Sequence, residues 1–242
     1  MRIVGRFLSS YTSILYFIMS STAESNSIGG RLVCYAAEKN KNFILEVLRD
    51  KIIPNHEFEE TRRLKILEIA SGTGEHAALF AESFSRVIYL PTEPNADMHN
   101  SIRSWTQEME DKVLDPVAFD VNSYDSLNSI LPESFINNQV DIMICINMIH
   151  ISPFIATDSL FNVASKCLNS SGCLLTYGPY RVNGCMVESN QNFDSSLKAR
   201  NPEWGVRDLE DVVEIAKKYN MFLFEKVSMP ANNLSLIFRR HL

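Results

Sequence analysis

Gly72 and Gly74 are the residues whose spacing most clearly indicates a binding site. They follow the apolar run Leu67–Ala70 and precede a stretch with helical periodicity that begins at Glu75. Glycine adopts positive φ at no steric cost and leaves room for a ligand beside the main chain. A helix that begins here presents unpaired N–H groups toward the same space. The pattern predicts a strand, a glycine turn and a helix around a ligand.

An acidic residue stands where a nucleotide-binding βαβ unit places one. Glu93 ends the apolar run Tyr89–Thr92 and lies 21 positions after Gly72. Such units use an acid about 20 residues on to bind ribose hydroxyls. The third glycine of the dinucleotide pattern is replaced by Ala77, which disfavours a nicotinamide oxidoreductase. We therefore expect a nucleoside-type ligand.

Glu68 lies inside the apolar strand that leads to the glycine turn. A carboxylate in such a position is costly to bury without a partner. It either helps to organise a ligand site or accepts a hydrogen bond from a nearby loop amide, which would still order the turn.

Other polar residues follow the remaining apolar runs, where a doubly wound sheet binds its ligands. Asp120 follows a short run and could contact an adenine amine or simply cap the next turn. Asn147 and His150 follow a central strand; His150 is our candidate general base, with a structural histidine as the alternative. Tyr177 and Tyr180 form either an aromatic wall around a substrate or an ordinary turn.

The elements that position these residues alternate along the chain. Alternating β and α signals predict a Rossmann-like, doubly wound α/β sheet, mostly parallel, with a C-terminal antiparallel hairpin strand. The hairpin comprises 222–227 and 234–238. Earlier strands are expected at 65–70, 86–90, 117–119, 140–146 and 173–177, and helices near 33–48, 75–83, 95–109 and 156–168.

Composition bounds the function. The 242 residues carry a net charge of −6 and are 45% hydrophobic, which suits one α/β domain over 28–242 and argues against an extended nucleic-acid surface. The five cysteines are widely spaced without a C-x-x-C pair. We interpret them as reduced, mostly core thiols, with neither a disulfide frame nor a zinc site.

Residues 1–27 differ in character and are excluded from the fold prediction. They contain Arg2 and Arg6 but no acid before Glu24, and the apolar stretch 14–19 is too short to span a bilayer. A secretory signal, a mitochondrial presequence and a non-native extension upstream of Met19 remain open. We expect a cytoplasmic protein, or a mitochondrial one if the segment is a presequence.

From about Tyr35 to Arg240 the chain resembles the methyltransferase-like protein 26 family, a poorly characterised group with the fold of class I S-adenosylmethionine (SAM)-dependent methyltransferases. The resemblance implies SAM as cofactor and a methyl acceptor that is an unidentified small molecule or protein. It is carried by the blocks 36–41, 67–76, 145–153, 177–180, 201–211 and 229–235.

The resemblance also implies roles for individual residues. Gly72 and Gly74 would face the methionine part of the cofactor, Glu93 would hold the ribose and Asp120 the adenine. Asn147 would face both cofactor and substrate. The implied cofactor-binding residues are Glu68, Ala70, Ser71, Gly72, Gly74, Glu93, Asp120 and Asn147.

Segment 190–211 is expected to be a loop that forms a lid and selects the substrate. Trp204 and Arg207 are its candidate substrate contacts. Arg207 would bind an anionic acceptor or, alternatively, pair with Asp208 or Glu210. The rival to an active methyltransferase is a catalytically silent SAM-fold protein that binds the cofactor or acts as a scaffold.

Overall fold

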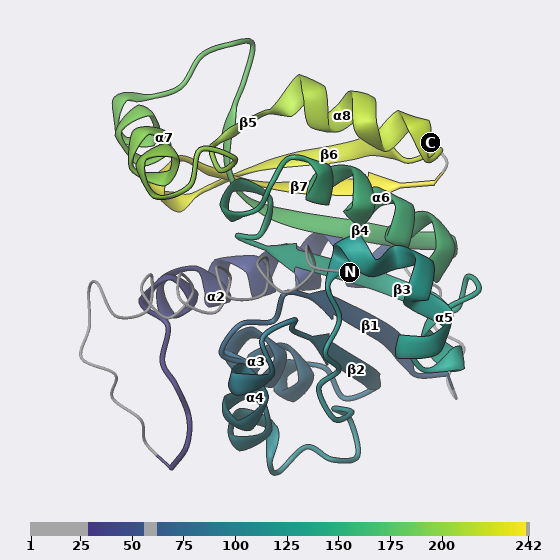
Figure 1. Cartoon of the computed structure of the whole chain (residues 1–242). Helices are drawn as coiled ribbons and strands as arrows, with labels where there is room; N and C mark the ends of the chain where they lie inside the picture. The colour runs from purple at the N-terminus through teal and green to yellow at the C-terminus, as the bar shows by residue number, and fades with distance from the viewer. Residues whose placement is uncertain (1–28, 56–61, 241–242) are drawn as a thin grey trace, which may run out of the picture.

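A computed structural model describes residues 29–55 and 62–240, so the predicted N-terminal extension 1–27 lies outside the described residues. One sheet with the strand order β2-β1-β3-β4-β7-β6 organises the molecule (Figure 1). β1 to β4 are parallel, and β7 enters antiparallel between β4 and β6. The predicted doubly wound sheet with its C-terminal antiparallel hairpin is confirmed. The strands are β1 Leu64–Ile69, β2 Val87–Thr92, β3 Val140–Ile146, β4 Leu168–Arg181, β5 Arg207–Asp208, β6 Phe222–Met229 and β7 Asn233–Arg239.

Helices cover both faces of the sheet. One apolar layer contains residues of α6 and α8, and the other contains residues of α2 and α3. Two faces must be covered because the parallel strands are largely apolar, and every residue of β3 is buried. The helices are α2 Tyr35–Val47, α3 Glu75–Ser83, α4 His99–Thr106, α5 Leu127–Ile130, α6 Ile155–Cys167, α7 Glu188–Arg200 and α8 Leu209–Lys218.

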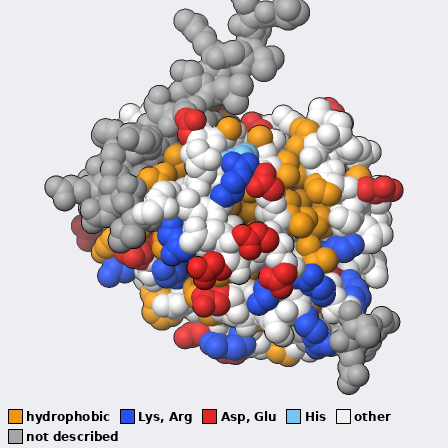
Figure 2. Space-filling view, turned by 90° about the horizontal axis from the view of Figure 1, so that it is seen from below, with side chains coloured by type: hydrophobic (Ala, Val, Ile, Leu, Met, Phe, Trp, Pro, Cys, Tyr) orange, Lys and Arg blue, Asp and Glu red, His pale blue; other side chains and the backbone are white. Residues whose placement is uncertain are grey.

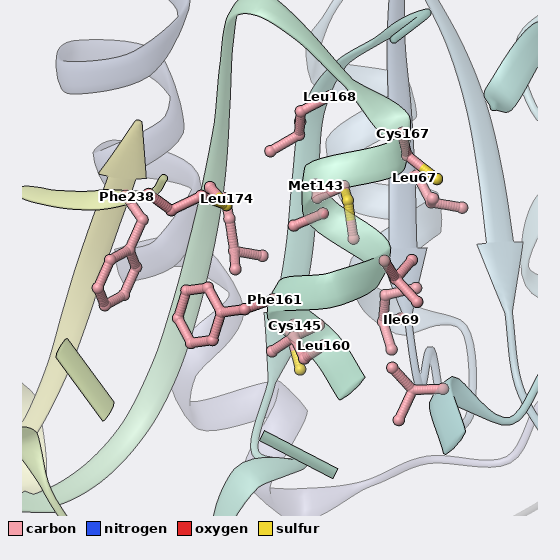
Figure 3. Packing of buried hydrophobic residues seen from close by; sticks show 14 of the residues in the cluster. Leu67, Ile69, Met143, Cys145, Leu160, Phe161, Cys167, Leu168, Leu174 and Phe238 are labelled. Carbon is pink, nitrogen blue, oxygen red and sulfur yellow. The ribbon is translucent and has the colours of Figure 1, made fainter. Parts of the chain in front are cut away.

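The layer beneath α6 is the larger part of the core (Figure 3). Phe161 of α6 and Phe238 of β7 face each other there, with ring centroids 4.9 Å apart and planes at 80°. Such an edge-to-face pair adds stability beyond its buried area. Met143 and Leu174 extend this packing across β3 and β4, which fixes the carboxyl ends of these strands relative to one another.

The predicted strand at 117–119 does not form. Only single bridges join Val113 to Tyr89 and Val117 to Thr92. Pro116 lies between the two bridges and has no N–H to donate. The segment nevertheless lies along β2, because the Glu93 N–H donates to the Val117 carbonyl at 3.0 Å.

The predicted loop at 190–211 is largely regular structure. It comprises most of α7, the short strand β5 and the start of α8. α7 lies beyond the carboxyl end of β4 (Figure 1). Within 29–55 and 62–240, none of the helices is both long and apolar enough to cross a bilayer.

Candidate functional site

The glycine turn between β1 and α3 is held open on one side. Ala70, Gly72 and Gly74 all have positive φ, of 57°, 56° and 96°. A Cβ atom built on Gly72 meets no described heavy atom within 4 Å outside its chain neighbours. On Gly74 it would stand 2.7 Å from the Ile102 Cα. Gly72 therefore borders free space, whereas Gly74 permits close packing of α3 on α4.

Glu93 joins the end of β2 to this turn. Its Oε2 accepts from the Gly72 N–H at 3.0 Å, and its Oε1 accepts from the Asn95 N–H at 3.0 Å. The side chain is 1% exposed. Burial raises the pKa of Glu93 to about 6, the two amide bonds oppose that rise, and the charge of Asp120 adds to it. The sequence-predicted acid and glycine turn are thus in direct contact.

Several buried polar atoms beside the turn have no hydrogen-bond partner among the described residues. Glu68 Oε2, Ser71 Oγ and Tyr89 Oη are such atoms, and the three side chains lie close enough to one another to interact. Burial raises the pKa of Glu68 to about 8; Ser71 and Tyr89 lower it, and the charge of Glu93 raises it. These three groups are polar neighbours of one another, so their burial does not require a ligand to satisfy them.

Asp120 is half-buried at the start of the 3₁₀ turn Val121–Ser126. It accepts from the N–H and the side-chain amide of Asn122, at 2.9 and 3.1 Å. The capping alternative therefore describes its present contacts, while an adenine contact stays a prediction.

Asn147 and His150 lie directly after β3. Asn147 has φ 58°, and its N–H donates to the Tyr177 carbonyl at 2.9 Å. The His150 side chain packs edge-on against Phe193 of α7, with ring centroids 5.5 Å apart. It is 5% exposed, and a Cβ on Gly178 would lie 3.1 Å from its Nδ1.

The surroundings of His150 disfavour it as a base. Burial, with a smaller contribution from the charge of Arg207, lowers the pKa of His150 to about 3. An imidazole with such a pKa is neutral at pH 7 but takes up a proton weakly. Its catalytic role stays a prediction, and its packing favours the structural alternative.

Tyr177 and Tyr180 both lie in β4 rather than in a turn, and their rings are on opposite faces of the sheet, so they do not form one pocket wall. Tyr180 lies in the layer with α6 and α8, where its hydroxyl is 2.9 Å from Thr176 Oγ1. Tyr177 lies in the opposite layer with α2 and α3. The two rings are separated because residues three apart on a strand point to opposite faces.

Arg207 binds backbone carbonyls, so the alternative of an ion pair with Asp208 or Glu210 is wrong. Its Nη2 donates to the Ser152 carbonyl at 2.6 Å and to the Glu203 carbonyl at 2.7 Å. Asp208 pairs instead with Arg181 at 2.9 Å. Arg207 therefore ties the turn after β3 to the segment that follows α7.

Trp204 is buried, and its role as a substrate contact stays a prediction. It packs against Leu197 and Val206 in a small apolar cluster. Next to it, the Gly205 N–H donates to the His150 carbonyl at 3.0 Å. The segment after α7 thus holds the backbone of His150 through this hydrogen bond.

Sequence reasoning missed a second group of polar residues at the start of α3. Asn40 of α2 and His76 are both buried and bonded, with Oδ1 and Nε2 2.7 Å apart. Glu75 accepts from the Cys34 N–H at 2.7 Å. Glu75 and His76 directly follow the glycine turn in sequence, and that position was the available signal.

The surface seen from below Figure 1 carries acidic and basic side chains interspersed, without a continuous basic field (Figure 2). This arrangement accords with the net charge of −6. The visible face therefore has no extended basic surface that would attract a nucleic-acid phosphate backbone.

Solved structures share this fold. PigF with SAH superposes with a TM-score of 0.64 at 12% identity, over 85% of this chain and 56% of that one. An O-methyltransferase family protein from Burkholderia thailandensis gives 0.63 at 11% identity, over 85% and 60%. This chain therefore spans less than two thirds of the length of either. The PH0226 protein from Pyrococcus horikoshii OT3 gives 0.61 at 12% identity, over 95% and 97%.

These likenesses concern the fold, since the identities are low. Together with the strand order, they show the class I methyltransferase fold. The sequence profile of a family described as "Protein of unknown function (DUF938)" matches residues 31–240, so the chain belongs to the DUF938 family.

Proposed function

We propose that this protein is a SAM-dependent methyltransferase that acts on a small molecule or a protein side chain. The observation that carries the proposal is the contact between Glu93 and the open glycine turn at Gly72. A nucleoside-type ligand needs space beside the main chain and a carboxylate for its ribose at the same point. The fold of the solved structures above supports this proposal, as does the sequence resemblance to the methyltransferase-like protein 26 family.

The residues present fit the cofactor. Gly72 borders the space that its methionine part would take, and Glu93 would accept from its ribose hydroxyls. Both Glu93 oxygens already accept one amide bond, and a carboxylate oxygen has capacity for a second. When bound, SAM supplies an electrophilic methyl group.

The protein's contribution to transfer is mainly positioning. Holding the acceptor in line with the methyl group lowers the barrier by several kcal/mol, since the entropy of alignment is lost on binding. Asn147 is the residue that we place next to the acceptor, because its positive φ presents it just beyond the end of β3. A general base is needed only for an acceptor that must lose a proton.

The alternative is a protein that binds SAM, or only a partner, without turnover. The buried, weakly basic His150 favours this alternative only for acceptors that require a base. The open glycine turn beside Glu93 supports ligand binding, which disfavours a protein that binds only a partner.

Native mass spectrometry of the full chain with SAM, SAH (S-adenosylhomocysteine) and NADH tests the ligand class. We expect adducts of SAM and SAH, and an NADH adduct alone would contradict the proposal. Methyl-labelled SAM is then incubated with metabolite and protein fractions of a cell extract. Transfer that disappears with Glu93→Ala supports the enzyme, and binding without transfer to any fraction supports the alternative.

A further inference from the structure

Residues 31–34, here called the N-terminal strap, lie along α3 and α4 before the chain turns into α2 (Figure 1). The Leu32 N–H donates to Ser101 Oγ at 2.9 Å, and its carbonyl accepts from Trp105 Nε1 at 2.9 Å. The strap is therefore fixed to α4 by both backbone groups of one residue. Arg31 adds a bond from Nε to the Ser104 carbonyl at 2.8 Å and lies over the Trp105 ring at 5.2 Å.

Two side chains connect the strap to the glycine turn at Thr73, which lies between Gly72 and Gly74. Glu75 Oε2 accepts from the Cys34 N–H at 2.7 Å and from Thr73 Oγ1 at 2.9 Å. Ser101 Oγ donates to the Thr73 carbonyl at 2.8 Å while it accepts from the strap. The strap and the turn are thus joined twice, once through Glu75 and once through Ser101.

Glu75 is unusual for a residue in the first turn of a helix, because it is only 2% exposed. One carboxylate oxygen makes both bonds, and the other, Oε1, has no partner among the described residues. A surface glutamate would serve the helix N-terminus equally well. Burying Glu75 costs free energy, and helix capping does not explain why it is buried. The hydrogen bonds that join it to the strap and to Thr73 do explain it.

We propose that Glu75 is a positioning residue for the cofactor, and that it acts by fastening the N-terminal strap to the glycine turn. This inference rests on the proposed SAM site. The strap leads directly into α2, whose Asn40 bonds His76 in the same turn of α3. Fastening it holds α2 and the turn in one arrangement before the ligand arrives, which lowers the ordering cost of binding.

The coupling has a reciprocal consequence. If the fastened strap increases affinity for the ligand, the bound ligand must stabilise the strap by the same free energy. We therefore expect SAH to slow hydrogen exchange at the amides of Leu32 and Cys34, which are the strap's donors to Ser101 and Glu75.

The test compares three variants of the full chain by calorimetric titration with SAH and by hydrogen exchange. Glu75→Ala removes both hydrogen bonds, whereas Glu75→Gln keeps an oxygen that accepts them. Glu82→Ala removes the same charge from an exposed position in the last turn of α3 and is the matched control. We expect about tenfold weaker binding for Glu75→Ala, faster exchange in the strap, and near-normal values for the other two.

Equal affinity in Glu75→Ala and the unaltered protein would overturn the inference. Equal loss in Glu75→Ala and Glu75→Gln would also overturn it, because the charge would then act on the ligand directly. Should Glu75→Ala fail to fold, Ser101→Ala breaks the second connection and must also weaken SAH binding and free the strap. Absence of SAH binding by the unaltered protein would contradict the proposed function itself, and the inference with it.

Discussion

At the scale of single residues, the site depends on carboxylates buried where the sequence is otherwise apolar. Glu68 and Glu93 are each 1% exposed, and burial is the largest cause of the raised pKa of each. Such groups destabilise the folded chain when ionised. Their retention at the glycine turn is explained by ligand binding better than by stability.

Glu93→Ala should weaken SAH binding by about 1–3 kcal/mol, the scale of losing hydrogen bonds to a charged group. The physical reason is the loss of the carboxylate that would accept from the ribose hydroxyls and that also accepts from the Gly72 amide. Calorimetry measures the effect, with the exposed Glu110→Ala as control. A neutral result with a folded variant would argue against ribose contact.

Glu68 predicts a pH dependence of stability. Its folded pKa of about 8 lies above the ordinary value of 4.5, so the folded chain binds more protons than the unfolded chain between these values. The free energy of unfolding must therefore fall as pH rises through this window, by at most about 1.4 kcal/mol per pH unit for one proton.

Glu68→Gln should remove that fall. Urea unfolding at pH 6.5, 7.0, 7.5 and 8.0 measures it above the pKa of Glu93, which is about 6. We expect the variant to gain stability relative to the unaltered protein as pH rises. Parallel profiles for the two proteins would show that Glu68 does not titrate in this range.

At the scale of elements, strand and helix periodicity identified the six strands of the main sheet within the described residues, including the edge strands β2 and β6, but added a strand at 117–119 that does not form. The runs at 140–146 and 75–83 match β3 and α3 because continuous burial and helical spacing are strong local signals. The strand expected at 117–119 is reduced to a single bridge at Val117, and Pro116 beside it has no N–H with which to extend the ladder. α7 was missed because its exposed, polar surface gives little apolar periodicity.

The site was predictable to the extent that it is local. Glu93 and Gly72 were recognised by spacing alone, and they are in contact. The buried state of Trp204 and the separation of Tyr177 from Tyr180 depend on which layer covers each side of β4. No local pattern carries that information.

His150→Ala tests how the elements beyond β3 and β4 are held together. Its ring fills the space between Phe193 and Gly178, so removing it should leave a cavity and cost about 2–4 kcal/mol in the free energy of unfolding. SAH affinity should stay near that of the unaltered protein. A stable variant that has lost methyl transfer would instead support the role of a base.

At the scale of the whole molecule, the two helical layers fix the carboxyl edge of the sheet as one rim. The glycine turn follows β1, Glu93 follows β2 and Asn147 follows β3. α7 lies beyond the end of β4 (Figure 1). The position of Gly72 on this rim is therefore set by packing far from it. Its substitution should affect the ligand more than the fold.

The most direct measurement of the central claim is calorimetric titration of the full chain with SAH, using Gly72→Val and Gly184→Val. Both glycines have positive φ, 56° and 71°, and a Cβ at either meets no described neighbour within 4 Å. The backbone strain is therefore comparable, and only Gly72 lies beside Glu93. We predict binding by the unaltered protein and Gly184→Val, and its loss in a folded Gly72→Val. Equal binding by both variants, or no binding by the unaltered protein, would contradict a cofactor site at the glycine turn.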